Sequence, residues 1–123
     1  MSKKNNIQAE NGKYGELLAQ NLLKNKGYEI LQKNWRSGKD EIDIIAKHQD
    51  TIIFVEVKTR SNVNYGKPYD FVDERKQNAI FRAAQSYIDN FNITYEVRFD
   101  IISVEIKKDG STLIDHITNA FSG

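Results

Sequence analysis

Cysteine is absent from this chain of 123 residues, which excludes a disulfide framework and a thiolate metal site. No apolar run approaches the roughly 18 residues that a membrane-spanning helix needs. The first residues lack the apolar stretch of a secretory signal. The net charge of only +1 provides no general attraction for nucleic acid, so such a site has to be a local patch. Together these features predict a cytoplasmic protein that does not enter a membrane.

The chain does contain enough apolar sequence for one folded domain. Its length and its 39% hydrophobic residues suit a single core. We expect this domain at residues 9–118, between a flexible N-terminal tail at residues 1–8 and a short C-terminal tail at residues 119–123.

Hydrophobic periodicity predicts two helices and five strands. The helices are expected at residues 9–26 and 72–90, and Asp73 is placed to cap the second helix. The strands are expected at residues 28–36, 41–47, 51–59, 95–107 and 111–117. The third strand is apolar on both faces, which is typical of a central strand covered on each side. The order α-β-β-β-α-β-β predicts an α/β fold with a mixed sheet flanked by helices.

The first predicted helix carries both apolar and small residues at helical spacing. The apolar residues are Tyr14, Leu17, Leu18 and Leu22. The small residues are Gly12, Gly15 and Ala19. The two glycines lower the helix propensity, but small side chains allow the helix backbone to approach a neighbouring element closely.

Charged residues interrupt the most strand-like segment, at Glu56 and Lys58. Alternation along a strand places these two side chains on one face, and Glu41 and Asp43 likewise share a face of the preceding strand. A hairpin pairs residues whose numbers have a constant sum. The short connection between these strands sets that sum at about 97, or at 99 if the register is slightly slipped. Either odd sum brings Asp43 to the same face as Glu56, directly opposite it or diagonally adjacent.

Two carboxylates this close repel each other beside an apolar core. A cation, a shared proton or exposure at the edge of the sheet can relieve this repulsion. Lys58 is one such cation, and a divalent metal is another candidate. Because Mg²⁺ prefers oxygen ligands and retains several waters, Asp43, Glu56 and the backbone carbonyl of Val57 would form a half-open site. A metal held there activates water, while Lys58 stabilises negative charge. The alternative is an ordinary exposed ion pair between Glu56 and Lys58.

The run Asp43, then Glu56-Val57-Lys58, resembles the motif of the PD-(D/E)XK, or restriction-endonuclease-like, nuclease superfamily. More closely, the chain is similar to the bacterial YraN family, uncharacterised protein family 0102. The resemblance covers nearly the whole chain, through GKYGELLAQNLLKNKGYEIL, NWRSGKDEIDIIA, IIFVEVKTRS, YGKPYDFVDERKQ and EVRFDII. One departure is the run Gly38-Lys39-Asp40-Glu41, where many relatives pass directly from glycine to Glu-Ile-Asp. It lengthens the turn and leaves Asp43 in place.

This resemblance implies a nuclease-like core similar to that of archaeal Holliday-junction resolvases, in which a helical glutamate joins the strand carboxylates. The matching residue here is Glu16, for which a solvated helix position is the alternative. By analogy Asp43 and Glu56 would bind Mg²⁺ or Mn²⁺, and Lys58 would serve the attacking water in phosphodiester hydrolysis. The implied catalytic residues are Glu16, Asp43, Glu56 and Lys58. Resolving a junction takes two sites, so the resemblance also suggests a homodimer.

Basic residues near these positions are candidates for contacts with nucleic-acid phosphates. Lys76 is the leading choice, because it falls in the first turns of the helix after the strand that carries Glu56. The full set of candidates is Arg36, Arg60, Lys67, Arg75 and Lys76. The alternative is that these charges are only solvated surface groups.

Three hypotheses for function follow. The leading one is a Mg²⁺-dependent endonuclease that acts on branched or otherwise structured DNA. The second is a nucleic-acid-binding protein with a vestigial or partner-dependent nuclease site. The third is a structural module whose charges pair only with each other, and a cluster of the four candidate catalytic residues around one site would argue against it.

Two further expectations concern charged residues outside this site. Arg98 and Asp100 share a strand face and are expected to form a structural ion pair. His48 and His116 are the only histidines, and their separation in the sequence favours two unrelated surface positions.

Overall fold

The computed structural model describes residues 3–61 and 72–122, with side chains from residue 10 onward. It contains two helices, α1 Lys3–Asn25 and α2 Glu74–Asn90. The strands are β1 Glu29–Ser37, β2 Asp40–His48, β3 Thr51–Ser61, β4 Glu96–Ile106 and β5 Thr112–Ile117. The predicted element order is therefore confirmed. No helix in the described ranges is both long enough and apolar enough to cross a lipid bilayer.

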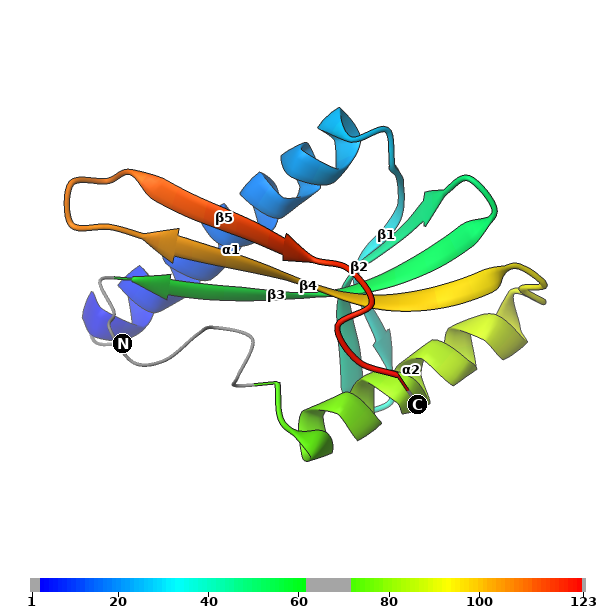
Figure 1. Cartoon of the computed structure of the whole chain (residues 1–123). Coiled ribbons are helices and arrows are strands. Elements are labelled where there is room, and N and C mark those ends of the chain that lie inside the picture. Colours follow the sequence, from blue (N-terminus) through cyan, green and yellow to red (C-terminus); the bar gives the residue numbers. More distant parts are fainter. Residues whose placement is uncertain (1–2, 62–71, 123) are drawn as a thin grey trace.

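One mixed sheet holds the five strands in the order β1-β2-β3-β4-β5. Three neighbouring pairs are antiparallel, whereas β3 and β4 are parallel. A parallel pair needs a long crossover connection, and α2 lies within the one that joins β3 to β4. The fold is thus the predicted α/β arrangement of a mixed sheet flanked by two helices, which Figure 1 shows.

The central position of β3 follows from the apolar cover on both of its faces. Val55 packs in a core with Leu23 of α1. Phe54, which points to the opposite face, packs in a second core with Tyr87 of α2. The two helices therefore cover opposite faces of the sheet, as Figure 1 shows. Burial on both sides stabilises the apolar run of this strand at residues 52–55.

The side of α1 that meets the sheet is the side with small residues. Gly15 lies so close to β3 that a Cβ atom added there would overlap the hydroxyl group of Thr59. Tyr14 and Leu17, which the spacing placed on the apolar side, are instead 45% and 52% exposed. The prediction for these two residues was wrong, because the helix is rotated to bring Gly15 and Ala19 against the sheet. The same close approach brings Glu16 to the sheet.

Gly15→Ala is expected to lower the free energy of unfolding by about 1–3 kcal/mol, because the added methyl group must displace Thr59 or the helix. Gly12→Ala is the matched control on the same helix, since its added Cβ meets no atom within 4 Å. That control should be stabilising by up to about 1 kcal/mol through helix propensity. Urea denaturation measures both changes, and equal stability of the two variants would contradict the close packing of α1 on β3.

The described structure extends beyond the predicted domain on both sides. α1 begins at Lys3, before the predicted start near residue 9. Phe121, which the sequence assigned to a tail, is 9% exposed and packs with Ile80 of α2 and Ile101 of β4. The Ala120 N–H also donates a hydrogen bond of 2.8 Å to a backbone carbonyl of β4. The chain after residue 118 therefore contributes to the core on the α2 side.

Candidate functional site

The β2–β3 hairpin places Asp43 opposite Glu56. Its paired residues sum to 99, from His48–Thr51 to Ile44–Val55, and the next pair in this register is Asp43 and Glu56. Regular pairing ends there, and Oδ2 of Asp43 instead accepts a hydrogen bond of 2.8 Å from the Val57 N–H. The register is therefore one of the two that the sequence predicted, and the backbone of β3 holds the Asp43 carboxylate in place.

Glu56 is a nearly buried carboxyl group, with only 7% of its surface exposed. Burial raises the pKa of Glu56 to about 8, and the charge of Asp43 and a hydrogen bond with Asp43 add to the rise. The positive charges of Lys76 and Lys58 oppose it. An additional cation beside the ionised form of Glu56 would offset the repulsion between Glu56 and Asp43.

Glu16 of α1 joins the two strand carboxylates. Burial raises the pKa of Glu16 to about 6, and the charges of Asp43 and Glu41 and a hydrogen bond with Asp43 act in the same direction. Asn34 opposes the rise. With the Asn34 amide oriented to suit its neighbours, its nitrogen donates to Glu16 at 3.2 Å and to Glu41 at 3.1 Å. Asp43 thus interacts with both Glu16 and Glu56. These three predicted residues form the centre of one acidic cluster.

Asn34 is a residue of this cluster that the sequence analysis did not identify. Its backbone is left-handed, with φ of 51°, and it falls opposite Asp43 in the β1–β2 ladder, between the pairs Lys33–Ile44 and Trp35–Ile42. Asparagine adopts this conformation more readily than most residues. An asparagine inside a predicted strand was the available signal, but its contact with α1 depends on the tertiary structure.

Two lysines place positive charge beside Glu56. Lys76, in the first turn of α2, forms an ion pair of 3.6 Å with Oε2 of Glu56. Lys58 is half-buried on β3 and close enough for its charge to lower the pKa of Glu56. Asp73 caps α2 as predicted, because its carboxylate accepts a hydrogen bond of 2.9 Å from the Lys76 backbone N–H. Lys76, predicted as a nucleic-acid contact, is therefore also a member of the acidic cluster.

In metal-free buffer, Glu56→Gln is expected to remove a pH dependence from the stability of the protein. The pKa of Glu56 is about 8 in the folded state against an ordinary value of 4.5, so between these values the folded protein binds more protons than the unfolded chain. The resulting stabilisation is complete below about pH 4.5 and is lost as the pH rises through about 8. The free energy of unfolding of the variant, measured relative to that of wild type, should therefore rise by roughly 2 kcal/mol or more from pH 5 to pH 9.

Urea unfolding at pH 5 and pH 9 measures this gain. Glu96→Gln is the control, because Glu96 is exposed on β4 and its substitution should leave the pH dependence of wild type unchanged. If the stabilities of wild type and Glu56→Gln changed in parallel with pH, Glu56 would not be the buried ionisable group described above.

The predicted phosphate-contacting residues occupy several places in the structure. Arg36 of β1 has a side chain that is 73% exposed and forms an ion pair of 3.1 Å with Glu41. Arg60 lies near the end of β3, and Arg75 precedes Lys76 in α2. Lys67 lies outside the described residues. Arg75 and Lys76 are the two of these candidates whose side chains line one groove.

A groove of about 300 Å³ lies beside the first half of α2 and the β1–β2 turn. Four basic and two acidic side chains line this basic groove: Lys39, Arg75, Lys76, Arg82, Asp40 and Asp73. Arg82 donates to both carboxylate oxygens of Asp40, at 3.2 Å each. Sequence analysis did not connect Arg82 with Lys39 and Asp40, because Asp40 and Arg82 are 42 positions apart and only the fold brings them together.

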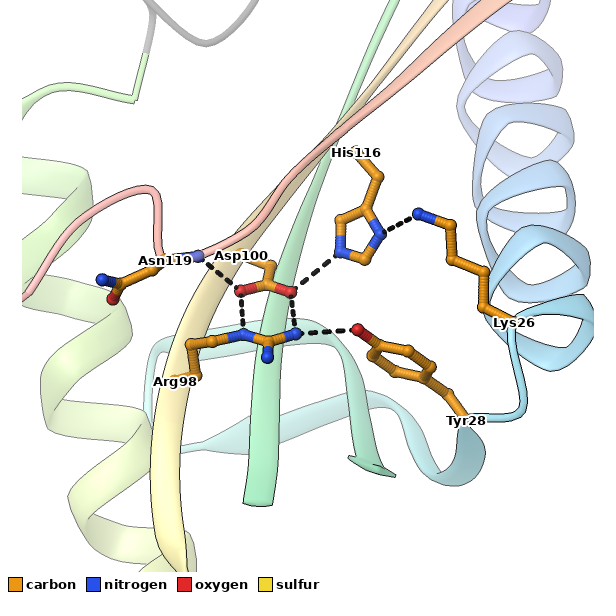
Figure 2. Close-up of polar contacts among 6 residues, drawn as sticks. All are labelled: Lys26, Tyr28, Arg98, Asp100, His116 and Asn119. Atoms are coloured by element: carbon orange, nitrogen blue, oxygen red, sulfur yellow. Dashed lines mark hydrogen bonds and ion pairs between the residues drawn. The ribbon is translucent and has the colours of Figure 1, made fainter. Parts of the chain in front are cut away.

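A second polar cluster is centred on Asp100 of β4, which is fully buried. Figure 2 shows its carboxylate accepting hydrogen bonds from Arg98 and His116 at 2.8 Å and from the Asn119 backbone N–H at 2.9 Å. Burial by itself would raise the pKa of Asp100, but these bonds outweigh burial and hold the pKa below its ordinary value. The predicted ion pair between Arg98 and Asp100 is confirmed.

His116 corrects a prediction, because its side chain is 2% exposed rather than on the surface. Lys26 donates a hydrogen bond of 2.9 Å to Nδ1 of His116, so Nε2 carries the proton that bonds Asp100. The β4–β5 ladder brings His116 opposite Ile102, which no local pattern indicated. His48 also contacts the protein, with its ring stacked on Tyr28 at a centroid distance of 4.3 Å. This cluster joins the segment that follows α1 to β4 and β5.

The acidic cluster offers a divalent cation two strand carboxylates and a backbone carbonyl. The N–H and C=O of one strand residue point toward the same neighbouring strand. Because the Val57 N–H meets Asp43, the Val57 carbonyl faces the same side, where regular pairing with β2 has ended. Across residues 10–61 and 72–122, no three side chains of Asp, Glu, His or Cys are arranged to hold a metal by themselves. A metal would therefore need Asp43, Glu56, the Val57 carbonyl and water, a mixture that suits Mg²⁺.

Comparison with known proteins identifies the relatives of this chain. The model of uncharacterised protein family UPF0102 matches residues 15–104. A UPF0102 protein of Caldanaerobacter subterraneus is 47% identical over 113 residues, covering 89% of this chain and 93% of that protein. Those of Christiangramia forsetii and Clostridioides difficile are 46% and 47% identical, and each match covers 91% of this chain and 93% or 96% of the relative. The matched segment includes every residue of the acidic cluster, and the chain belongs to uncharacterised protein family UPF0102.

Proposed function

We propose that this chain is a divalent-metal-dependent nuclease that hydrolyses phosphodiester bonds in branched or otherwise structured DNA. The observation that carries the proposal is the contact of Asp43 with both Glu16 and Glu56, where the β2–β3 ladder ends. Three carboxyl groups this close are unfavourable unless protons or a cation join them. Such a cluster also counts against a module whose charges pair only with each other. The resemblance to PD-(D/E)XK nucleases supports the same conclusion.

The residues of the cluster suit the separate tasks of phosphodiester hydrolysis. Asp43, Glu56 and the Val57 carbonyl would hold Mg²⁺ or Mn²⁺. Such an ion, when bound, supplies a more nucleophilic water and offsets charge on the phosphate. Lys58 would orient the attacking water or stabilise the charge that develops on a phosphate oxygen. Glu16, through its hydrogen bond with Asp43, would position that carboxylate.

DNA is the proposed substrate because basic side chains border the acidic cluster. The whole chain has a net charge of only +1, so phosphate binding depends on these local groups. Arg75 and Lys76 lie together on α2, and Lys76 reaches Glu56. Arg36, Arg60 and Lys67 are further proposed contacts. The preference for branched DNA and a homodimeric state rest on the resemblance to junction resolvases.

Cleavage of linear, flap and four-way DNA in Mg²⁺ or Mn²⁺, beside matched reactions in EDTA, tests the proposed function. We expect products only in the metal-containing reactions, with flap or four-way DNA cleaved faster than linear DNA. If the protein bound these DNAs but cleaved none of them in either metal, the result would favour a nucleic-acid-binding protein with a vestigial or partner-dependent site.

A further inference from the structure

The Lys76 side chain belongs to two neighbouring sites, the acidic cluster and the basic groove. Its ammonium group is 3.6 Å from Oε2 of Glu56, and its side chain also lines the basic groove with Arg75. The Glu56 side chain is 7% exposed and is fixed on the central strand, whereas the Lys76 side chain is 41% exposed. A lysine carries its charge on a flexible stem of four carbons. The ammonium group is therefore the partner that can move.

The basic groove carries positive charge beyond what its own acids balance. Arg82 already occupies both carboxylate oxygens of Asp40, and Asp73 accepts from the first turn of α2. Among the described residues, neither Lys39 nor Arg75 forms an ion pair. Several converging cations next to a helix N-terminus suit a phosphate group.

We infer that the basic groove binds a backbone phosphate of a nucleic-acid strand, and that Lys76 couples this binding to the metal. The inference rests on the proposed function. Without metal, the Lys76 ammonium group lies beside Oε2 of Glu56 and favours the ionised form of this carboxyl group. A divalent cation on the same carboxylate repels the ammonium group, which then turns to the groove and strengthens its hold on the phosphate. Metal and strand therefore each raise the affinity for the other, as a coupling between two sites requires.

Lys76→Met tests the exchange, because it removes the charge and retains an apolar side chain of similar length. Lys108→Met is the control, since Lys108 is exposed in the turn between β4 and β5. Binding of Mn²⁺ alone is measured by calorimetry, without any nucleic acid. Lys76→Met should bind Mn²⁺ about fivefold more tightly than wild type, because the competing ammonium group is gone. Lys108→Met should bind it as wild type does.

Binding of a fluorescent single-stranded oligonucleotide, with Ca²⁺ or with EDTA, tests the groove. Ca²⁺ should strengthen binding more in wild type than in Lys76→Met. Arg75→Gln should weaken oligonucleotide binding severalfold under both conditions and leave Mn²⁺ affinity unchanged. If Lys76→Met bound Mn²⁺ no more tightly, or Arg75→Gln bound the oligonucleotide normally, the inference would fail even for a protein that cleaves DNA. Wild type without saturable Mn²⁺ binding would overturn the proposed function, and the coupling with it.

Discussion

Asp43→Asn should reduce metal-dependent DNA cleavage by about a hundredfold to a thousandfold while leaving the fold intact. Asparagine is nearly the same shape, and its amide oxygen can still accept the hydrogen bond of 2.8 Å from the Val57 N–H. It cannot supply the negative charge with which a carboxylate binds a divalent cation. The variant therefore separates the charge of Asp43 from its contribution to the hairpin.

Single-turnover cleavage in Mg²⁺ and Mn²⁺ gives the rates, and circular dichroism verifies the fold. Asp115→Asn is the matched control, because Asp115 is exposed on β5 and the same change there should leave cleavage unaffected. DNA binding in EDTA should survive in both variants. If Asp43→Asn retained more than about a tenth of wild-type cleavage, Asp43 would not be a metal ligand of this reaction.

Asp100→Asn should lower the free energy of unfolding by about 3 kcal/mol or more, since it breaks a buried ion pair on one side. The carboxylate accepts two hydrogen bonds from Arg98 at 2.8 Å, one from His116 and one from the Asn119 N–H. An amide NH₂ group would face one of these donors, and the charge of Arg98 would lose its partner. In a chain of 123 residues, this loss should lower the Tm by roughly 10 °C.

Thermal unfolding measures this effect, and the exposed Asp89→Asn on α2 is the control that should leave the Tm nearly unchanged. The cause is tested with Arg98→Met. The double variant, Arg98→Met with Asp100→Asn, should be more stable than the sum of the single losses predicts, because no unpaired arginine remains. Additive losses would contradict a direct energetic coupling between Arg98 and Asp100.

The strand carboxylates could be predicted because a hairpin is a local structure. The two-residue turn at positions 49–50 sets the register of β2 and β3, and alternation along each strand then decides which side chains share a face. Asp43 and Glu56 therefore follow from residues close together in the sequence. The cap of α2 by Asp73 is local in the same sense.

The environment of those carboxylates could not be predicted in this way. Rotation of α1 depends on how closely Gly15 approaches Thr59, so the exposure of Leu17 and the position of Glu16 became clear only from the packing. The contact of Lys76 with Glu56 likewise requires α2 to fold back over the sheet. His116 was misplaced for a similar reason, since its partners come from the segment that follows α1 and from β4.

By itself, the sequence of this protein determined the order of its elements, the central strand, and two possible registers of one hairpin that both put Asp43 and Glu56 on one face. Periodicity and turn length suffice for these features, because both act over a few neighbouring residues. Only the tertiary structure decided which side of α1 meets β3, that Asn34 and Lys76 join the acidic cluster, and that Asp100 and His116 are buried together. These contacts join elements distant in the sequence, and their geometry depends on how side chains of the whole domain pack.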